Sequence, residues 1–141
     1  MMINDNAALP EDVNPLLGYL GIRLVEWQPG RAEFAIDIEP RHLNRSGFLQ
    51  GGVTATILDA ACGYAGLWLD EHPVSGNAVT AMLSISYLAP AKQGTLTASG
   101  RVIKAGQKLC FASGELADAN GTLIATAQGT FMRRPSEPSI A

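Results

Sequence analysis

One carboxylate in this sequence lies within an apolar segment, where an ionised side chain is unfavourable. Asp59 falls within the apolar run 53–69, and an ionised carboxylate in apolar surroundings costs several kcal/mol unless it is paired or hydrogen-bonded. A carboxylate held in such a place can activate a water molecule or attack a carbonyl directly. An Asp on a narrow solvated stripe of a helix would give the same pattern, so both interpretations stay open.

Two glycines, Gly51 and Gly52, come directly before the apolar run, where a helix is expected to start. The first N–H groups of a helix have no partner within it and lie at its positive end. Because glycine has no side chain, a carbonyl group can approach these N–H groups closely. They could therefore hold the oxyanion that forms on an attacked carbonyl, although glycines at a helix start can also serve only as a tight turn.

The elements that must position these residues follow from the hydropathy pattern. The segment 14–20 predicts a short amphipathic helix, with Asn14 as its cap and Gly21 after its end. The segment 31–39 alternates apolar and polar residues, which predicts a strand with one solvated face. The helix that begins at Gly51 is apolar on nearly every side, so other elements must surround it.

The second half of the chain supplies the surrounding strands. They are expected at residues 78–89, 95–105, 108–118 and 122–133. Gly106-Gln107 and Asn120-Gly121 are typical of two-residue hairpin turns, which would join the last three strands in an antiparallel meander. We therefore predict an α+β fold in which a curved antiparallel sheet wraps around one long central helix. It forms a single domain over residues 1–141, with its core at about 18–133 and a loose tail at 135–141.

Composition and charge limit the classes of partner. The formal net charge is −3 and the ten Lys and Arg residues are scattered, so we expect no binding to nucleic acid. The N-terminal residues have no signal-peptide pattern, and Asp59 in the longest apolar run argues against a membrane span. We expect a cytoplasmic protein that does not bind membranes. Cys62 and Cys110 lie in apolar surroundings and are expected in the core, with no metal site.

A motif extends from the loop into the helix. The segment His42-Leu43-Asn44-Arg45-Ser46-Gly47-Phe48-Leu49-Gln50-Gly51-Gly52 is followed by Asp59, seven positions after the second glycine. It resembles the pattern HxNxxGxxHGG of the PaaI-like thioesterases, in the hotdog superfamily that includes the phenylacetate-pathway and 4-hydroxybenzoyl-CoA thioesterases. The likeness continues through residues 85–92 and 104–108 and covers about 18–133. It departs from the pattern at Gln50, which stands where the family usually has histidine.

The resemblance implies a hotdog fold and the hydrolysis of an acyl-CoA thioester, with no cofactor other than the coenzyme A of the substrate. It implies that Asp59 acts on the carbonyl, that the Gly51 N–H holds the carbonyl oxygen, and that Thr80 supports the attacking water. Asn44 could hold either that water or the thioester oxygen through its amide. Gln50 in the histidine position can form hydrogen bonds but cannot titrate. The further substrate-binding residues that the resemblance implies are Gly52, Tyr87, Pro90, Lys92, Gly106 and Lys108.

A geometric argument concerns the number of chains in the site. Gly51 and Asp59 are eight residues apart, about 12 Å along a helix at 1.5 Å per residue. They cannot serve one carbonyl carbon together, so Asp59 must meet the Gly51 amide of a second subunit if both are catalytic. The resemblance implies the same arrangement, with Asn44 and Gly51 from one chain and Asp59 and Thr80 from the other. We expect a homodimer, or a homotetramer built from two dimers.

Two other functions stay open. Gln50 is compatible with a binding module that keeps the acyl-CoA pocket without turnover. A hotdog hydratase or dehydratase needs a histidine base, whereas His42 is expected to pack within its loop and His72 lies in a polar turn. The sequence does not determine the acyl group. Small residues leave room beside the long helix, namely Ala55, Ala61, Gly63 and Ala65.

Overall fold

The computed structural model describes residues 14–69 and 77–134. Its elements are, in chain order, α1 (Pro15–Leu20), β1 (Arg23–Gln28), β2 (Arg31–Asp37), the 3-10 helix η1 (Pro40–His42), α2 (Gly51–Leu67), β3 (Asn77–Tyr87), β4 (Thr95–Ala105), β5 (Leu109–Asp118) and β6 (Leu123–Arg134). The predictions for the tail at 135–141 and for His72 lie outside these residues.

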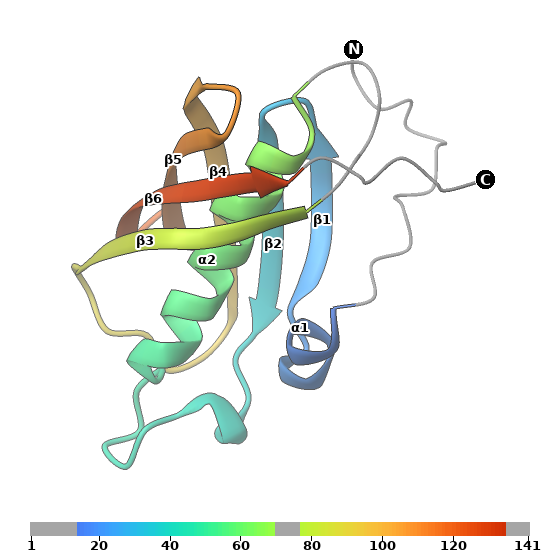
Figure 1. Cartoon of the computed structure of the whole chain (residues 1–141). Helices are drawn as coiled ribbons and strands as arrows, with labels where there is room; N and C mark the ends of the chain where they lie inside the picture. The colour runs from blue at the N-terminus through green and yellow to red at the C-terminus, as the bar shows by residue number, and fades with distance from the viewer. Residues whose placement is uncertain (1–13, 70–76, 135–141) are drawn as a thin grey trace.

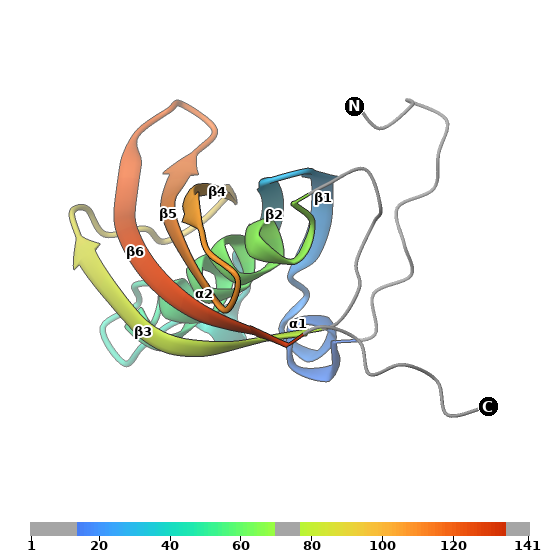
Figure 2. The same ribbon diagram turned by 45° about the horizontal axis from the view of Figure 1, so that its top comes forward.

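The strands form one antiparallel sheet in the order β1-β2-β4-β5-β6-β3. The sheet curves around α2, which runs through its concave side (Figures 1 and 2). The predicted meander of β4, β5 and β6 is confirmed. The preceding strand, β3, crosses over to pair with β6, so β1 and β3 are the two edges of the sheet.

The first helix and the first strands agree with the pattern in the sequence. Asn14 caps α1 by accepting a hydrogen bond from the Leu17 N–H, and Gly21 ends the helix in the left-handed region at φ 72°. Strand β2 ends at Asp37, two residues earlier than predicted, because the chain turns into η1 before Pro40. Its neighbour β1 has a bulge in its pairing between Leu24 and Glu26.

Both hairpin turns form, but the first lies one residue later than predicted and the second has a longer loop than predicted. The Gly106 N–H donates to Leu109 O, so the tight turn lies at Gln107-Lys108, one residue later than expected. In the β5–β6 turn the Asp118 N–H donates to Thr122 O, which leaves three residues in the loop. The Asp118 carboxylate accepts the N–H groups of Asn120 and Thr122, and Gly121 has a φ of 82°. This side-chain bonding favours the longer turn, which ends on a glycine in the left-handed region.

Helix α2 forms the centre of the core, as its apolar pattern predicts. Ile57, Leu58, Ala61 and Ala65 are fully buried against the sheet. The helix packs so closely on β4 that a Cβ at Gly100 would lie 2.2 Å from Ala61 O. The expectation that Cys62 and Cys110 are core residues is also confirmed, since both are buried free thiols. The predicted architecture of a curved sheet around one long helix is therefore correct.

Candidate active site

The central carboxylate has a hydroxyl partner. Asp59 is half-buried in the middle of α2, and the Thr80 hydroxyl on β3 donates a hydrogen bond of 2.7 Å to its Oδ1. Among the described residues it has no second hydrogen bond or ion pair. The carboxylate is thus held by one oxygen, and Oδ2 has no hydrogen-bond partner among these residues.

The start of α2 has the geometry that an oxyanion site requires. The helix begins at Gly51, as predicted, and the Val53 and Thr54 N–H groups are the first that donate back to Gln50 O. The N–H groups of Gly51 and Gly52 come before those bonds and lie at the positive end of the helix. Tyr87 at the end of β3 holds this turn in place, because its hydroxyl donates to Gly51 O at 2.7 Å.

The loop before α2 is organised by Asn44. Its side-chain oxygen accepts the N–H groups of Ser46 at 2.9 Å and Phe48 at 3.1 Å. This bonding uses the oxygen of the amide, so the NH₂ group is the half that can donate to a ligand. The loop also contacts the segment after β3, where the Lys92 ammonium lies 4.7 Å from the centre of the Phe48 ring. Asn44, Lys92 and Gly51 are therefore brought to the same end of the sheet.

His42 has a structural position in this loop. It is buried, and its Nδ1 accepts the Glu39 N–H at 3.0 Å. The proton must then lie on Nε2, which donates to Leu20 O at 2.7 Å. Nδ1 thus caps the short helix η1 and Nε2 joins the loop to the end of α1, as expected for a packing residue. His42 is the one histidine within residues 14–69 and 77–134, so that part of the chain offers no histidine base.

The predicted substrate-binding residues divide between two ends of the molecule. One group is near the start of α2: Asn44, Gln50, Gly51, Gly52, Tyr87, Pro90 and Lys92. Gly106 and Lys108 are instead at the β4–β5 turn, and the Arg133 N–H donates to Lys108 O. Thr80 lies at that second end as well, since it pairs with Phe131 two residues before Arg133. One chain therefore places Asp59, Thr80 and Lys108 away from Gly51 and Lys92.

A cavity of about 190 Å³ lies beside the carboxylate. Its described lining residues come from α1, α2, β3 and β6: Asn14, Leu16, Leu17, Thr56, Asp59, Ala60, Gly63, Tyr64, Leu67, Ala78, Thr80 and Phe131. The contribution of α1 to this cavity was not predicted from the sequence. The amphipathic pattern of 14–20 predicted only that this helix has a buried face. The structure shows that Leu16 and Leu17 line the cavity beside Asp59.

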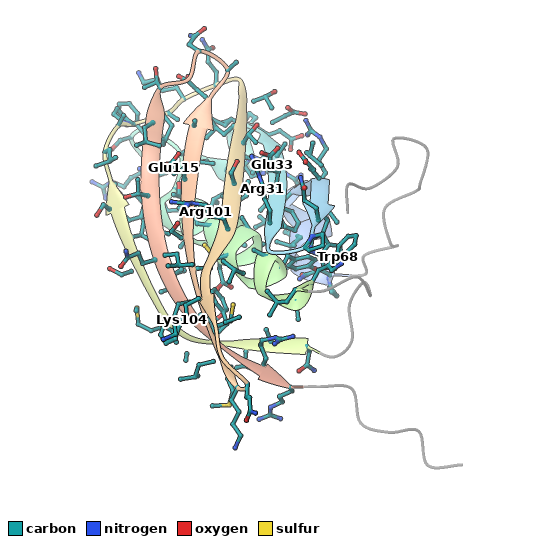
Figure 3. The ribbon with its side chains drawn as sticks, turned by 90° about the horizontal axis from the view of Figure 1, so that it is seen from above. Arg31, Glu33, Trp68, Arg101, Lys104 and Glu115 are labelled. Carbon is teal, nitrogen blue, oxygen red and sulfur yellow. The ribbon has the colours of Figure 1, made fainter. Side chains whose placement is uncertain are left out.

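Larger hollows lie on the opposite face of the sheet. A cavity of about 360 Å³ is lined by a row of hydroxyl and amide side chains that includes Ser84, Ser113 and Gln128. A neighbouring cavity of about 250 Å³ is lined by Arg31, Arg101 and Glu115, among others. Figure 3 shows these charged side chains gathered with Glu33 over the strands, on the side of the sheet away from α2. Neither hollow contains Asp59 or the start of α2, so we assign the chemistry to the smaller cavity.

The fold and this site define a hotdog domain with a carboxylate in its central helix and free N–H groups at the start of that helix. Comparison with protein families agrees with this class. The family described as the thioesterase superfamily matches residues 46–125, more than half of the chain. The protein therefore belongs to the thioesterase superfamily.

Individual relatives support the same assignment. The chain is 36% identical over 111 residues to human acyl-coenzyme A thioesterase 13, covering 77% of each protein. It superposes on a thioesterase family protein from Silicibacter pomeroyi with a TM-score of 0.79 at 29% identity, covering 87% of this chain and 91% of the other. The PaaI protein of the E. coli phenylacetic acid degradation operon gives a TM-score of 0.80 at 22% identity, with coverages of 88% and 87%. That last likeness shows the fold alone.

Two features of the described residues, 14–69 and 77–134, concern the predicted partners. No helix within them is long and apolar enough to cross a membrane. They also contain no cluster of three or more His, Cys, Asp or Glu side chains that could hold a metal ion.

Proposed function

We propose that this protein hydrolyses an acyl-CoA thioester to the free acid and coenzyme A, and that Asp59 carries the chemical step. The observation that carries the proposal is the Thr80–Asp59 hydrogen bond at the edge of a cavity lined by both apolar and polar side chains. Membership of the thioesterase superfamily and the similarity to an acyl-coenzyme A thioesterase support it.

The chemistry needs two groups that act on opposite sides of one carbonyl. Asp59 takes a proton from a water molecule whose oxygen bonds to the carbonyl carbon, or it forms that bond itself and is released by water afterwards. The negative charge that develops on the carbonyl oxygen is held by the Gly51 N–H and the Asn44 amide. The carbon–sulfur bond then breaks, and the CoA thiolate leaves and takes up a proton.

The two groups come from different subunits in this proposal. Gly51 and Asp59 lie on one uninterrupted helix, about 12 Å apart along its axis. Two such helices that face each other antiparallel across a two-fold axis bring the start of one to the middle of the other. This arrangement gives two equivalent sites per dimer. It also brings the end of one chain that carries Lys92 toward the end of the other that carries Lys108.

The remaining predicted residues have roles in binding. Tyr87 holds the start of α2, and Pro90 directs the chain toward Lys92. We assign Lys92 and Lys108 to the phosphates of CoA, since an ammonium group pairs with phosphate as a point charge. Gly52 and Gly106 leave the backbone open to the ligand. Gln50 is exposed at the start of α2 and can orient the thioester by hydrogen bonding.

The test is release of the CoA thiol from benzoyl-, phenylacetyl- and octanoyl-CoA by the purified protein, measured with a thiol-reactive dye. Hydrolysis of at least one ester supports the proposal. Tight CoA binding without thiol release would instead support the binding module that Gln50 permits. Light scattering under the same conditions tests the shared site, because an active monomer would contradict it.

A further inference from the structure

We propose that Gly63 determines which acyl groups this protein accepts, because it forms the floor of the cavity beside Asp59, and that this cavity takes an uncharged, apolar acyl group. This inference rests on the proposed thioesterase function. It concerns the part of the substrate that the sequence left undetermined.

The cavity follows one face of α2. Thr56, Asp59, Ala60, Gly63, Tyr64 and Leu67 recur at intervals of three and four residues, so they lie along one side of the helix. The opposite walls are Leu16 and Leu17 of α1 and Phe131 of β6. Asp59 is near one end of this face. An acyl group whose carbonyl carbon lies at Asp59 therefore has about 12 Å of helix ahead of it, the rise from Asp59 to Leu67.

Gly63 lies one turn beyond Asp59, where the acyl group must pass. A Cβ placed on Gly63 would lie 3.4 Å from Cε1 of Phe131, at the limit of ordinary van der Waals contact. The space over Gly63 is thus about one methyl group deep on that side. Ala61 and Ala65, two other small residues of the helix, are fully buried against the sheet and leave no such space. Ala60 and Gly63 are therefore the small residues of α2 that line the cavity, and Gly63 is the one without a side chain.

Helix α1 covers the cavity on the side opposite α2, and we call this side the roof of the cavity. Asn14 caps that helix, and its side-chain NH₂ donates to the Tyr64 hydroxyl at 3.5 Å, near the limit for a hydrogen bond. Leu17 is buried and Leu16 is 55% exposed. A substitution at Leu16 can therefore change the roof without removing a core residue.

Charge decides the chemical class of the acyl group. Asp59 is the one charged side chain among the described lining residues, which contain no Lys, Arg or His. An acyl group that ends in a carboxylate would find no cation among these described residues and would lie near the negative charge of Asp59. Both effects are unfavourable in a partly buried apolar site. The cavity should consequently reject ω-carboxyl acyl groups and accept saturated ones of the same length.

The experiment compares kcat/KM for acetyl-, butyryl-, octanoyl- and glutaryl-CoA, with pentanoyl-CoA as the uncharged match for glutaryl-CoA. We expect the wild type to prefer octanoyl- to acetyl-CoA and pentanoyl- to glutaryl-CoA. Gly63→Leu should lower the ratio of kcat/KM for octanoyl-CoA to that for acetyl-CoA by at least about tenfold, because a filled pocket excludes the larger group. Gly63→Ala should shift the profile in the same direction by a smaller factor.

Gly18→Ala is the matched control. It adds the same methyl group to the roof helix at a position where a Cβ meets nothing within 4 Å, outside the cavity. Its acyl profile should equal that of the wild type. A second variant, Leu16→Lys, supplies the missing cation at an exposed position and should raise the ratio of glutaryl- to pentanoyl-CoA hydrolysis.

The outcomes separate this inference from the function on which it rests. If the wild type hydrolyses acyl-CoA but neither Gly63→Leu nor Gly63→Ala changes the profile in folded protein, the assignment of Gly63 is wrong. If Leu16→Lys leaves the glutaryl ratio unchanged, the charge argument is wrong. Absence of hydrolysis of every ester by the wild type would overturn the thioesterase function, and the pocket assignment with it.

Discussion

The Thr80 hydroxyl donates a 2.7 Å hydrogen bond to Asp59 Oδ1, and this contact joins the edge strand β3 to the middle of α2. At the other end of the same strand the Tyr87 hydroxyl bonds to Gly51 O, at the start of α2. Strand β3 therefore fixes both of the positions to which we assign chemistry.

Asp59→Asn should leave the fold and CoA binding intact and lower kcat by about 10²- to 10⁴-fold, the usual contribution of a general base, or by more if Asp59 is the nucleophile. Asparagine has nearly the same shape and no charge, so thermal stability should hold or rise. Steady-state kinetics, a melting curve and a CoA-binding titration measure the three effects. Unchanged kcat in folded protein would exclude Asp59 from the chemical step.

Thr80→Val should lower kcat by about tenfold with little effect on KM, because it removes the hydroxyl that orients Asp59 and keeps the branched shape. A tenfold loss of kcat is at the low end of the effect of removing a hydrogen bond to a charged group. We expect the low end because Thr80 is exposed. Thr80→Ser is the control and should restore most of the activity. If serine and valine are equally impaired, Thr80 acts through packing and not through its hydroxyl.

Mixing two inactive variants should restore activity if the site is shared. Asp59→Asn and Asn44→Asp homodimers should each be nearly inactive, and a mixed dimer should have one intact site of two. Aspartate at 44 keeps the oxygen that Ser46 and Phe48 need and removes the amide donor, so the loop is preserved. Differently tagged chains and a two-step purification isolate the mixed dimer. An inactive mixed dimer would show that the residues act within one chain or that one is not catalytic.

Gln50→His should be tolerated and should keep or raise turnover, because it restores the residue usual in PaaI-like thioesterases at an exposed position of α2. The Gln50 side chain makes no capping hydrogen bond, so the helix start does not depend on it. The measurement is kcat for the best acyl-CoA, together with the melting temperature. Lost activity in a folded protein would give Gln50 a specific role of its own.

Cys62 should be unreactive in the folded protein. Burial, together with the smaller effect of the Asp59 charge, raises the pKa of its thiol to about 12. The reactive thiolate is therefore nearly absent at pH 8, and alkylation should be slow until urea unfolds the chain. The unfolded thiol ionises near its ordinary pKa of 9.0, so this group lowers stability as the pH rises above about 9. Mass spectrometry after timed alkylation, with and without urea, measures the protection.

The sequence by itself determined the architecture, because each element carries its own periodic signal. The alternation over 31–39 predicted β2, and an apolar run without a polar face predicted that α2 is enclosed. The motif around Gly51 and Asp59 pointed to the carboxylate and the helix start. Turn positions were less well determined, since the Asp118 carboxylate redirected the β5–β6 turn through side-chain bonds that a two-residue signal does not contain.

Only the tertiary structure decided which residues meet. That Thr80 bonds to Asp59, that Leu16 and Leu17 of α1 cover the space beyond it, and that Gly63 faces Phe131 all depend on how β3, β6 and α1 pack on α2. Contacts between residues far apart in the chain leave no periodic pattern in the sequence. Small residues of α2 therefore looked equivalent until the sheet buried Ala61 and Ala65 and left Gly63 at the cavity.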